Sequence, residues 1–171
     1  MKTVTLALVF LTMTTCGRSA QVRDDTQLNG PVSFRVIIEQ QNPEFCVEGP
    51  EFMVARNEDQ WVTAFDMQTE CATAADEVRL PHVDFDAEIA VAAWWKVAGC
   101  LGWKIQTTAV ERAGDAIVVK ASSTGPAAGE VCATALGGLE SFLALERSER
   151  LSGAKTFRFV LDGKPVGSVA S

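Results

Sequence analysis

The sequence predicts a mainly β fold of the α+β class: an antiparallel β sandwich or a partly closed barrel with one helix packed on it. Strand-length runs rich in Val, Ile, Phe and Trp recur between residues 32 and 169, and several alternate apolar with polar residues. Two turns, Ala113-Gly114-Asp115 and Asp162-Gly163, have the composition of β-hairpins. Only one segment has clear helix signals. This pattern favours a layered β domain with a single helix on one side.

The helix is expected over residues 58–69. Asn57 can cap its first turn, and Gln60 occupies the capping-box position three residues later. Trp61 and Phe65 lie one turn apart and form an apolar side. We therefore interpret Trp61 as a core anchor of this helix.

The predicted strands follow the apolar runs of the chain. They cover residues 32–38, 52–55, 89–95, 103–112, 116–122, 131–136, 142–147, 156–161 and 164–169. In the run that ends at Trp95, alternate residues share one face, so Trp94 points to the opposite face. One of these two tryptophans must then be exposed, sit at a bulge, or be covered by the helix or by a partner.

The N-terminus has the features of an export signal. Residues 1–16 begin with a basic residue, continue with an apolar run and end in small residues. The run is shorter than the roughly 20 apolar residues that a bilayer span needs. We expect an export signal over 1–16, a flexible linker over 17–31 and a single β-rich domain over 32–171.

Cys16 stands where a bacterial lipoprotein leader places its lipidated cysteine. A thioether-linked lipid there would be the only attachment of this protein to a membrane. An ordinary secretory cut after Ala20 is the alternative, although Arg18 occupies its minus-three position. Both interpretations predict an exported protein, periplasmic or on the cell surface, and lipidation is the one that we favour.

The charge balance is acidic, with 15 Lys and Arg against 22 Asp and Glu and a net charge of −7. The first 20 residues contain Lys2 and Arg18 but no acidic residue, so the exported chain is more acidic still. Nucleic-acid binding depends on clustered basic residues, which argues against a nucleic-acid partner.

Motifs for catalysis, metal binding and cofactor binding are weak in this chain. His82 is the only histidine, and the sequence contains no Gly-x-Ser-x-Gly elbow for a serine nucleophile. Asp84 and Asp86 resemble the start of a calcium loop, but the ligands and glycine that should follow are missing. We therefore predict no catalytic residue, no metal site, no cofactor and a non-enzymatic role.

The order of several motifs resembles the PrcB-like family of protease-complex accessory subunits. The motifs are Trp61 in a short helix, the segments 80–85, 102–105 and 117–119, and then Pro126 and Gly129. The resemblance extends over about residues 34–147. It implies an exported or lipid-anchored, non-enzymatic protein that associates with a secreted protease. Where the family pattern reads Gly-Gly-Tyr, this chain has Leu101-Gly102-Trp103.

The function that follows from these features is binding of another exported or envelope protein, which the resemblance suggests is a protease. Partner contacts are expected at Gly102, Trp103 and Trp94, because tryptophans dominate protein interfaces. Trp103 also shares a face with Ile105, so a core position is the competing interpretation. A binding module for a small ligand or glycan, with surface tryptophans as the stacking platform, is the alternative function.

Export predicts disulfide bonds among the cysteines other than Cys16. These are Cys46, Cys71, Cys100 and Cys132, and no pair has the Cys-x-x-Cys spacing of a zinc or redox site. Of the three possible connectivities we favour Cys46–Cys71 with Cys100–Cys132; unpaired buried thiols are the alternative. Peptide mapping without reduction should find two disulfides in the native protein. Two or more thiols open to alkylation would contradict this prediction.

Overall fold

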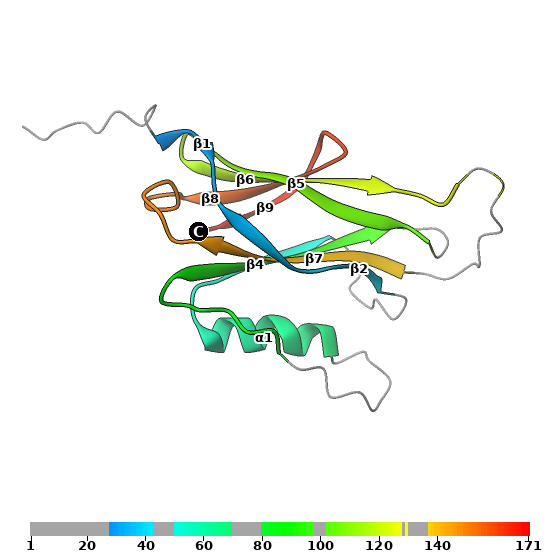
Figure 1. Cartoon of the computed structure of the whole chain (residues 1–171), viewed down its shortest axis with the longest axis horizontal. Helices are drawn as coiled ribbons and strands as arrows, with labels where there is room; N and C mark the ends of the chain where they lie inside the picture. Colours follow the sequence, from blue (N-terminus) through cyan, green and yellow to red (C-terminus); the bar gives the residue numbers. More distant parts are fainter. Residues whose placement is uncertain (1–27, 43–49, 70–79, 98–101, 128, 130–136) are drawn as a thin grey trace, which may run out of the picture.

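The computed structural model describes residues 28–42, 50–69, 80–97, 102–127, 129 and 137–171 (Figure 1). Two β-sheets pack face to face, and one helix covers the outer face of the smaller sheet. Two sets of predictions lie outside the described residues. They are the strand expected over 131–136 and the predictions for the five cysteines, Cys16, Cys46, Cys71, Cys100 and Cys132.

The five-stranded sheet has the order β1-β5-β6-β8-β9, and the four-stranded sheet has the order β2-β7-β4-β3. The five-stranded sheet consists of β1 (Gly30–Pro31), β5 (Lys104–Ala113), β6 (Ala116–Thr124), β8 (Thr156–Leu161) and β9 (Lys164–Ala170). The four-stranded sheet consists of β2 (Phe34–Asn42), β3 (Glu51–Ala55), β4 (Glu88–Val97) and β7 (Gly137–Glu146), and the helix is α1 (Glu58–Thr69). Neighbouring strands are antiparallel except β6 and β8, which are parallel. This parallel pair arises because the chain passes through β7 in the other sheet between them.

The predicted fold class is confirmed: within the described ranges the chain forms a sandwich of two sheets with one helix and without a closed barrel. The predicted bounds of α1 and β8 agree with the structure, whereas β7 begins at Gly137 instead of Phe142. The expected linker over 17–31 is wrong at its end. Gly30 and Pro31 pair with β5, and the side chain of Asn29 accepts a 2.8 Å hydrogen bond from the backbone of Gly114.

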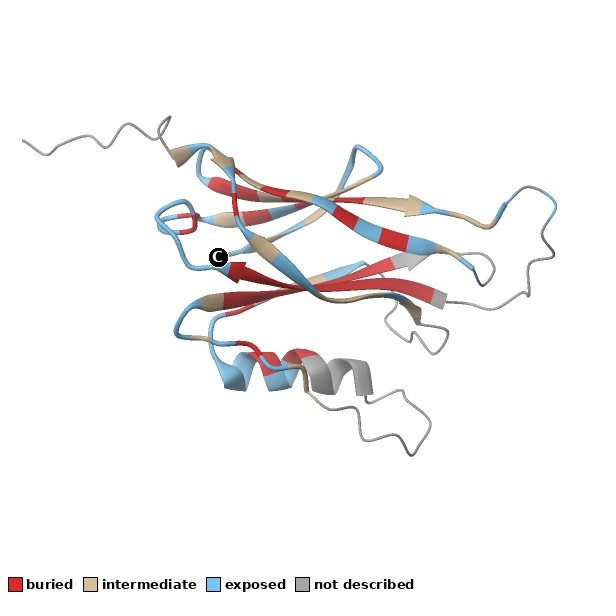
Figure 2. Cartoon of the chain, in the orientation of Figure 1, coloured by how far each residue is buried: buried red, intermediate tan, exposed pale blue. Residues whose placement is uncertain are grey.

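The main core lies between the two sheets (Figure 2). Phe52 of the edge strand β3 packs against it: its ring stacks on Phe159, with centroids 4.0 Å apart, and meets Trp95 edge-on at 5.2 Å. Alternate residues of β4 face this core, namely Ile89, Val91, Ala93 and Trp95. The period-two pattern predicted for β4 is therefore confirmed.

A second core lies between α1 and the four-stranded sheet. Trp61 of the helix is 1% exposed, its indole N–H donates to the carbonyl of Pro81 at 2.9 Å, and its ring meets Phe142 edge-on. Trp94 also meets Phe142 and is only 2% exposed. Both adjacent tryptophans are thus buried, since β4 is covered by a sheet on one face and by the helix side on the other.

The N-terminus of α1 is capped as its sequence predicts. The Oδ1 atom of Asn57 accepts a 2.9 Å hydrogen bond from the backbone N–H of Gln60. The side chain of Gln60 in turn accepts a hydrogen bond from the backbone N–H of Arg56. In a standard capping box the donor would be the N–H of the cap residue, which is Asn57 here. Glu58 and Asp59 place negative charge in the first turn, which the helix dipole favours.

Gly167 of β9 is required for the contact between the edge strands β9 and β3. A Cβ atom added there would overlap the ring of Phe52, which Phe159 and Trp95 hold in place. Gly167→Ala should therefore lower the free energy of unfolding by about 1–3 kcal/mol, as overpacked cores do. Urea denaturation measures this, with Ser168→Ala at the exposed neighbouring position as control. Equal stability of both variants would contradict the packing described here.

Candidate functional site

Strand β2 binds the edge of the opposite sheet through its side chains. Short β1 covers β5 only at Glu111 and Arg112, so further along this edge β5 pairs with no other strand of the described residues. Glu39 accepts a 2.6 Å hydrogen bond from the N–H of Thr107. Gln41 follows two residues later and so lies on the same side of β2. Its side-chain oxygen accepts hydrogen bonds from the backbone N–H groups of Gly102 and Trp103, at 2.7 and 3.1 Å. These side chains therefore link the two sheets and fix the backbone where β5 begins.

The Gly102–Trp103 corner has a defined shape. Gly102 is exposed and has φ +102°, a conformation that residues with a Cβ rarely adopt. The indole of Trp103 lies over Gly125, where an added Cβ would come within 3.1–3.3 Å of three ring carbons. Gly125 therefore provides the space in which the ring rests.

Trp103 is half-buried, and its ring packs against the core between the sheets while part of it stays accessible. The sequence left two interpretations for this residue, core or interface, and the structure combines features of both. The other three tryptophans, Trp61, Trp94 and Trp95, are buried. Trp103 is consequently the one tryptophan of this chain that is not fully buried.

The structure contradicts a surface role for Trp94. Trp94 belongs to the core under α1, whereas Trp103 packs against the core between the sheets. Its indole N–H has no hydrogen-bond acceptor in the part of the chain that the structure describes. A stacking surface built from Trp94 or Trp95 is excluded for the same reason, since both rings are buried.

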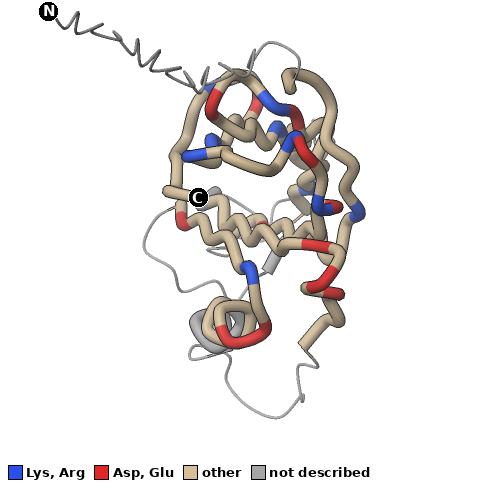
Figure 3. Tube along the Cα trace, turned by 90° about the vertical axis from the view of Figure 1, so that its left-hand side faces the viewer, with Lys and Arg blue, Asp and Glu red and all other residues tan. Residues whose placement is uncertain are grey.

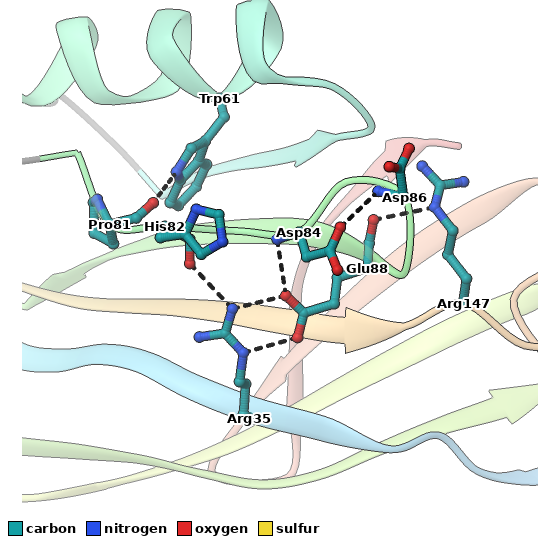
Figure 4. A network of polar contacts seen from close by, with 8 residues as sticks. All are labelled: Arg35, Trp61, Pro81, His82, Asp84, Asp86, Glu88 and Arg147. Atoms are coloured by element: carbon teal, nitrogen blue, oxygen red, sulfur yellow. Dashed lines mark hydrogen bonds and ion pairs between the residues drawn. The ribbon is translucent and has the colours of Figure 1, made fainter.

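A polar network that the sequence reasoning missed connects β2 with the turn before β4 (Figure 4). Arg35 donates two hydrogen bonds to the carboxylate of Glu88, at 2.8 and 2.7 Å, and a third to the carbonyl of His82 at 3.1 Å. The N–H of Asp84 donates to Glu88 at 3.2 Å. Arg35 and Glu88 are 53 residues apart, so no local pattern could have indicated this pair.

The acidic residues of this turn have structural roles. Asp84 accepts a side-chain hydrogen bond from the N–H of Asp86 at 3.1 Å, and its carbonyl accepts from Ala87 and Glu88. No group of three or more His, Cys, Asp or Glu side chains is placed to hold a metal ion among the residues described. Within the same residues, no helix has the length and hydropathy to cross a membrane.

The hydrogen bonds from Arg35 lower the pKa of Glu88 below its usual value, and the N–H of Asp84 and the charges of Arg35 and His82 act in the same direction. Burial opposes this shift by disfavouring the charged carboxylate. Because the folded-state pKa is the lower one, the stabilisation is fully present above the unfolded-state pKa. It is lost as the pH falls through the folded-state pKa.

This linkage predicts how stability depends on pH. The wild type should lose on the order of 1 kcal/mol through this pair on going from pH 7 to pH 2–3, since the Arg35 side chain is 47% exposed and solvent screens the pair. Glu88→Gln should have a correspondingly shallower pH dependence. Urea unfolding at several pH values tests this, with Glu111→Gln, which loses the exposed pair with Lys120, as control. Parallel pH curves for wild type and Glu88→Gln would contradict the expected linkage.

No protein-family model, curated protein or solved structure gives a significant match to this chain. The resemblance to the PrcB-like family therefore rests on the sequence motifs given above and enters the argument as a proposal.

Proposed function

We propose that this chain is an exported, non-enzymatic protein-binding domain that contacts its partner through the Gly102–Trp103 corner. Following the PrcB-like resemblance, the proposed partner is a secreted or envelope protease, which the domain stabilises or modulates by contact. The observation that carries the proposal is the ring of Trp103, the one partly exposed tryptophan of the chain.

Rigidity of the corner supports this proposal. Gln41 holds the backbone N–H groups of Gly102 and Trp103, and Gly125 lets the indole rest against the end of β6. A surface that is already ordered loses little conformational entropy when a partner binds. A fixed tryptophan with an accessible ring is also the residue type that most often dominates binding energy at protein interfaces.

The distribution of charge fits a protein partner better than nucleic acid. Seen from the end at which β5 turns into β6, acidic and basic residues are interspersed along strands and turns (Figure 3). The chain as a whole is acidic. An excess of negative charge disfavours phosphate backbones, whose binding depends on many basic residues.

Capture from an envelope extract tests the proposal. Wild-type protein in mild detergent should retain one protein in stoichiometric amount. The purified partner should bind Trp103→Ala about 2 kcal/mol or more weakly, as measured by calorimetry. The accompanying loss of stability should be smaller than the 3–5 kcal/mol typical of a fully buried tryptophan, because Trp103 is only half-buried.

Gly167→Ala is the matched control, because β9 lies at the far edge of the five-stranded sheet from the β1–β5 side. It should destabilise the domain yet bind the partner normally when folded. If both variants lose affinity in proportion to their loss of stability, Trp103 is a core residue and the interface proposal fails. The ligand-binding alternative would be supported instead if the extract yields no retained protein and if the domain binds a glycan that Trp103→Ala no longer binds.

A further inference from the structure

A cavity of about 320 Å³ lies at the other end of the sandwich from Trp103, where β7 ends and β4 begins. Its polar lining comes from Arg56, Arg147, Ser148 and Ser152, and its apolar lining includes Ile89 and Leu151. This volume is at the lower end of the range for small-molecule sites, about 300–1,000 Å³. The cavity therefore has room for one small ligand with a polar and an apolar part.

Arg147 is held in place without being neutralised. Its Nε atom donates to the carbonyls of Phe85 and Glu88, and its Nη2 atom donates to the carbonyl of Arg56, all at 3.1 Å. Figure 4 shows the contact with Glu88. These acceptors are uncharged, and Nη1 has no acceptor among the described residues. The guanidinium is thus oriented by the protein and keeps both its charge and free N–H groups.

Arg56 has the same property. Its Nη2 atom donates to the hydroxyl of Ser171, and none of the ion pairs within the described part of the chain includes Arg56 or Arg147. Asp86, which follows the Phe85 carbonyl, is not within ion-pair distance of either. Two arginines without carboxylate partners at one cavity are notable in a chain with an excess of acidic residues.

A third arginine adds positive charge behind the cavity wall. Arg112 is only 5% exposed and donates to the carbonyls of Gly114, Arg150, Ser152 and Gly153. These contacts satisfy its N–H groups but bring no negative charge. Because the carbonyl of Ser152 points to Arg112, the N–H of Gly153 across the same planar peptide points away from it. Arg112 therefore brings a positive charge next to the loop that lines the cavity.

We propose that this Arg56–Arg147 cavity binds a small oxyanion, a carboxylate or phosphate group, on a short apolar stem. A guanidinium fork matches the two oxygens of either group. Ser148 and Ser152 add hydroxyl groups, and Ile89 and Leu151 form the contact for the stem. This site is separate from the proposed partner surface at Trp103, so either proposal can fail without the other.

Titration of the full-length purified protein tests the site. Amide chemical shifts are followed while sodium phosphate, acetate or 3-methylbutanoate is added at constant ionic strength. We expect saturable shifts at Gly153 and its neighbours. Tightest binding of phosphate identifies a phosphate-bearing ligand. Tightest binding of 3-methylbutanoate, with acetate weaker, identifies a small organic acid that uses the apolar lining.

Variants separate a specific site from general charge attraction. Arg56→Gln should weaken binding about tenfold or more, as loss of a charge-assisted hydrogen bond does. Asp86→Asn should strengthen binding, because it removes the acidic residue next to the Phe85 carbonyl. Arg158→Gln, an exposed position on β8, should leave binding unchanged. Equal weakening by Arg56→Gln and Arg158→Gln, or the absence of saturation with all three anions, would overturn the proposal.

Discussion

Burial of β4 on both faces is the constraint on which the rest of this structure depends. Alternate side chains of this strand enter the core between the sheets, and the intervening ones, including Trp94, enter the core on the helix side. β3 and β7 flank this strand in the sheet, and packed side chains cover both of its faces. The position of α1 is one consequence, since Trp61 and Phe142 complete the layer next to Trp94.

The two sheets are joined along their edges by interactions of different kinds. On one side the chain passes from β1 to β2 at Val32, and Glu39 and Gln41 bind backbone N–H groups on the β5 side. On the other side, Gly167 of β9 meets the ring of Phe52 in β3. Polar closure on one edge and apolar closure on the other hold the sandwich together without a continuous hydrogen-bonded barrel.

The two ends of the sandwich have different chemistry as a result. At one end, closure through Gln41 leaves Trp103 half-buried on a fixed backbone, which suits contact with a protein. At the other end, backbone carbonyls hold Arg112 and Arg147 in place, and no carboxylate among the described residues forms an ion pair with them, which suits an anion. The two proposals together describe a domain that binds a protein partner at one end and a small acidic molecule at the other.

The sequence by itself determined the features whose causes are local. The Asn57 cap set the start of α1, and the Asp162-Gly163 turn between β8 and β9 has the positive φ angles, 51° and 76°, that its composition indicated. The alternation along β4 likewise showed that its two tryptophans point to opposite faces. These features depend on side chains within a few residues of one another, so a local pattern is enough to indicate them.

Only the tertiary structure decided which surfaces are covered. The sequence suggested Trp94 as an exposed contact for a partner. It is buried, because residues from α1 and β7, which are distant in the sequence, pack beside it. The Arg35–Glu88 pair, the parallel β6–β8 pairing and the arginines around the anion cavity also join distant segments. Such contacts follow from how sheets and loops pack in space, and amphipathic periodicity alone cannot specify which distant partner a face will meet.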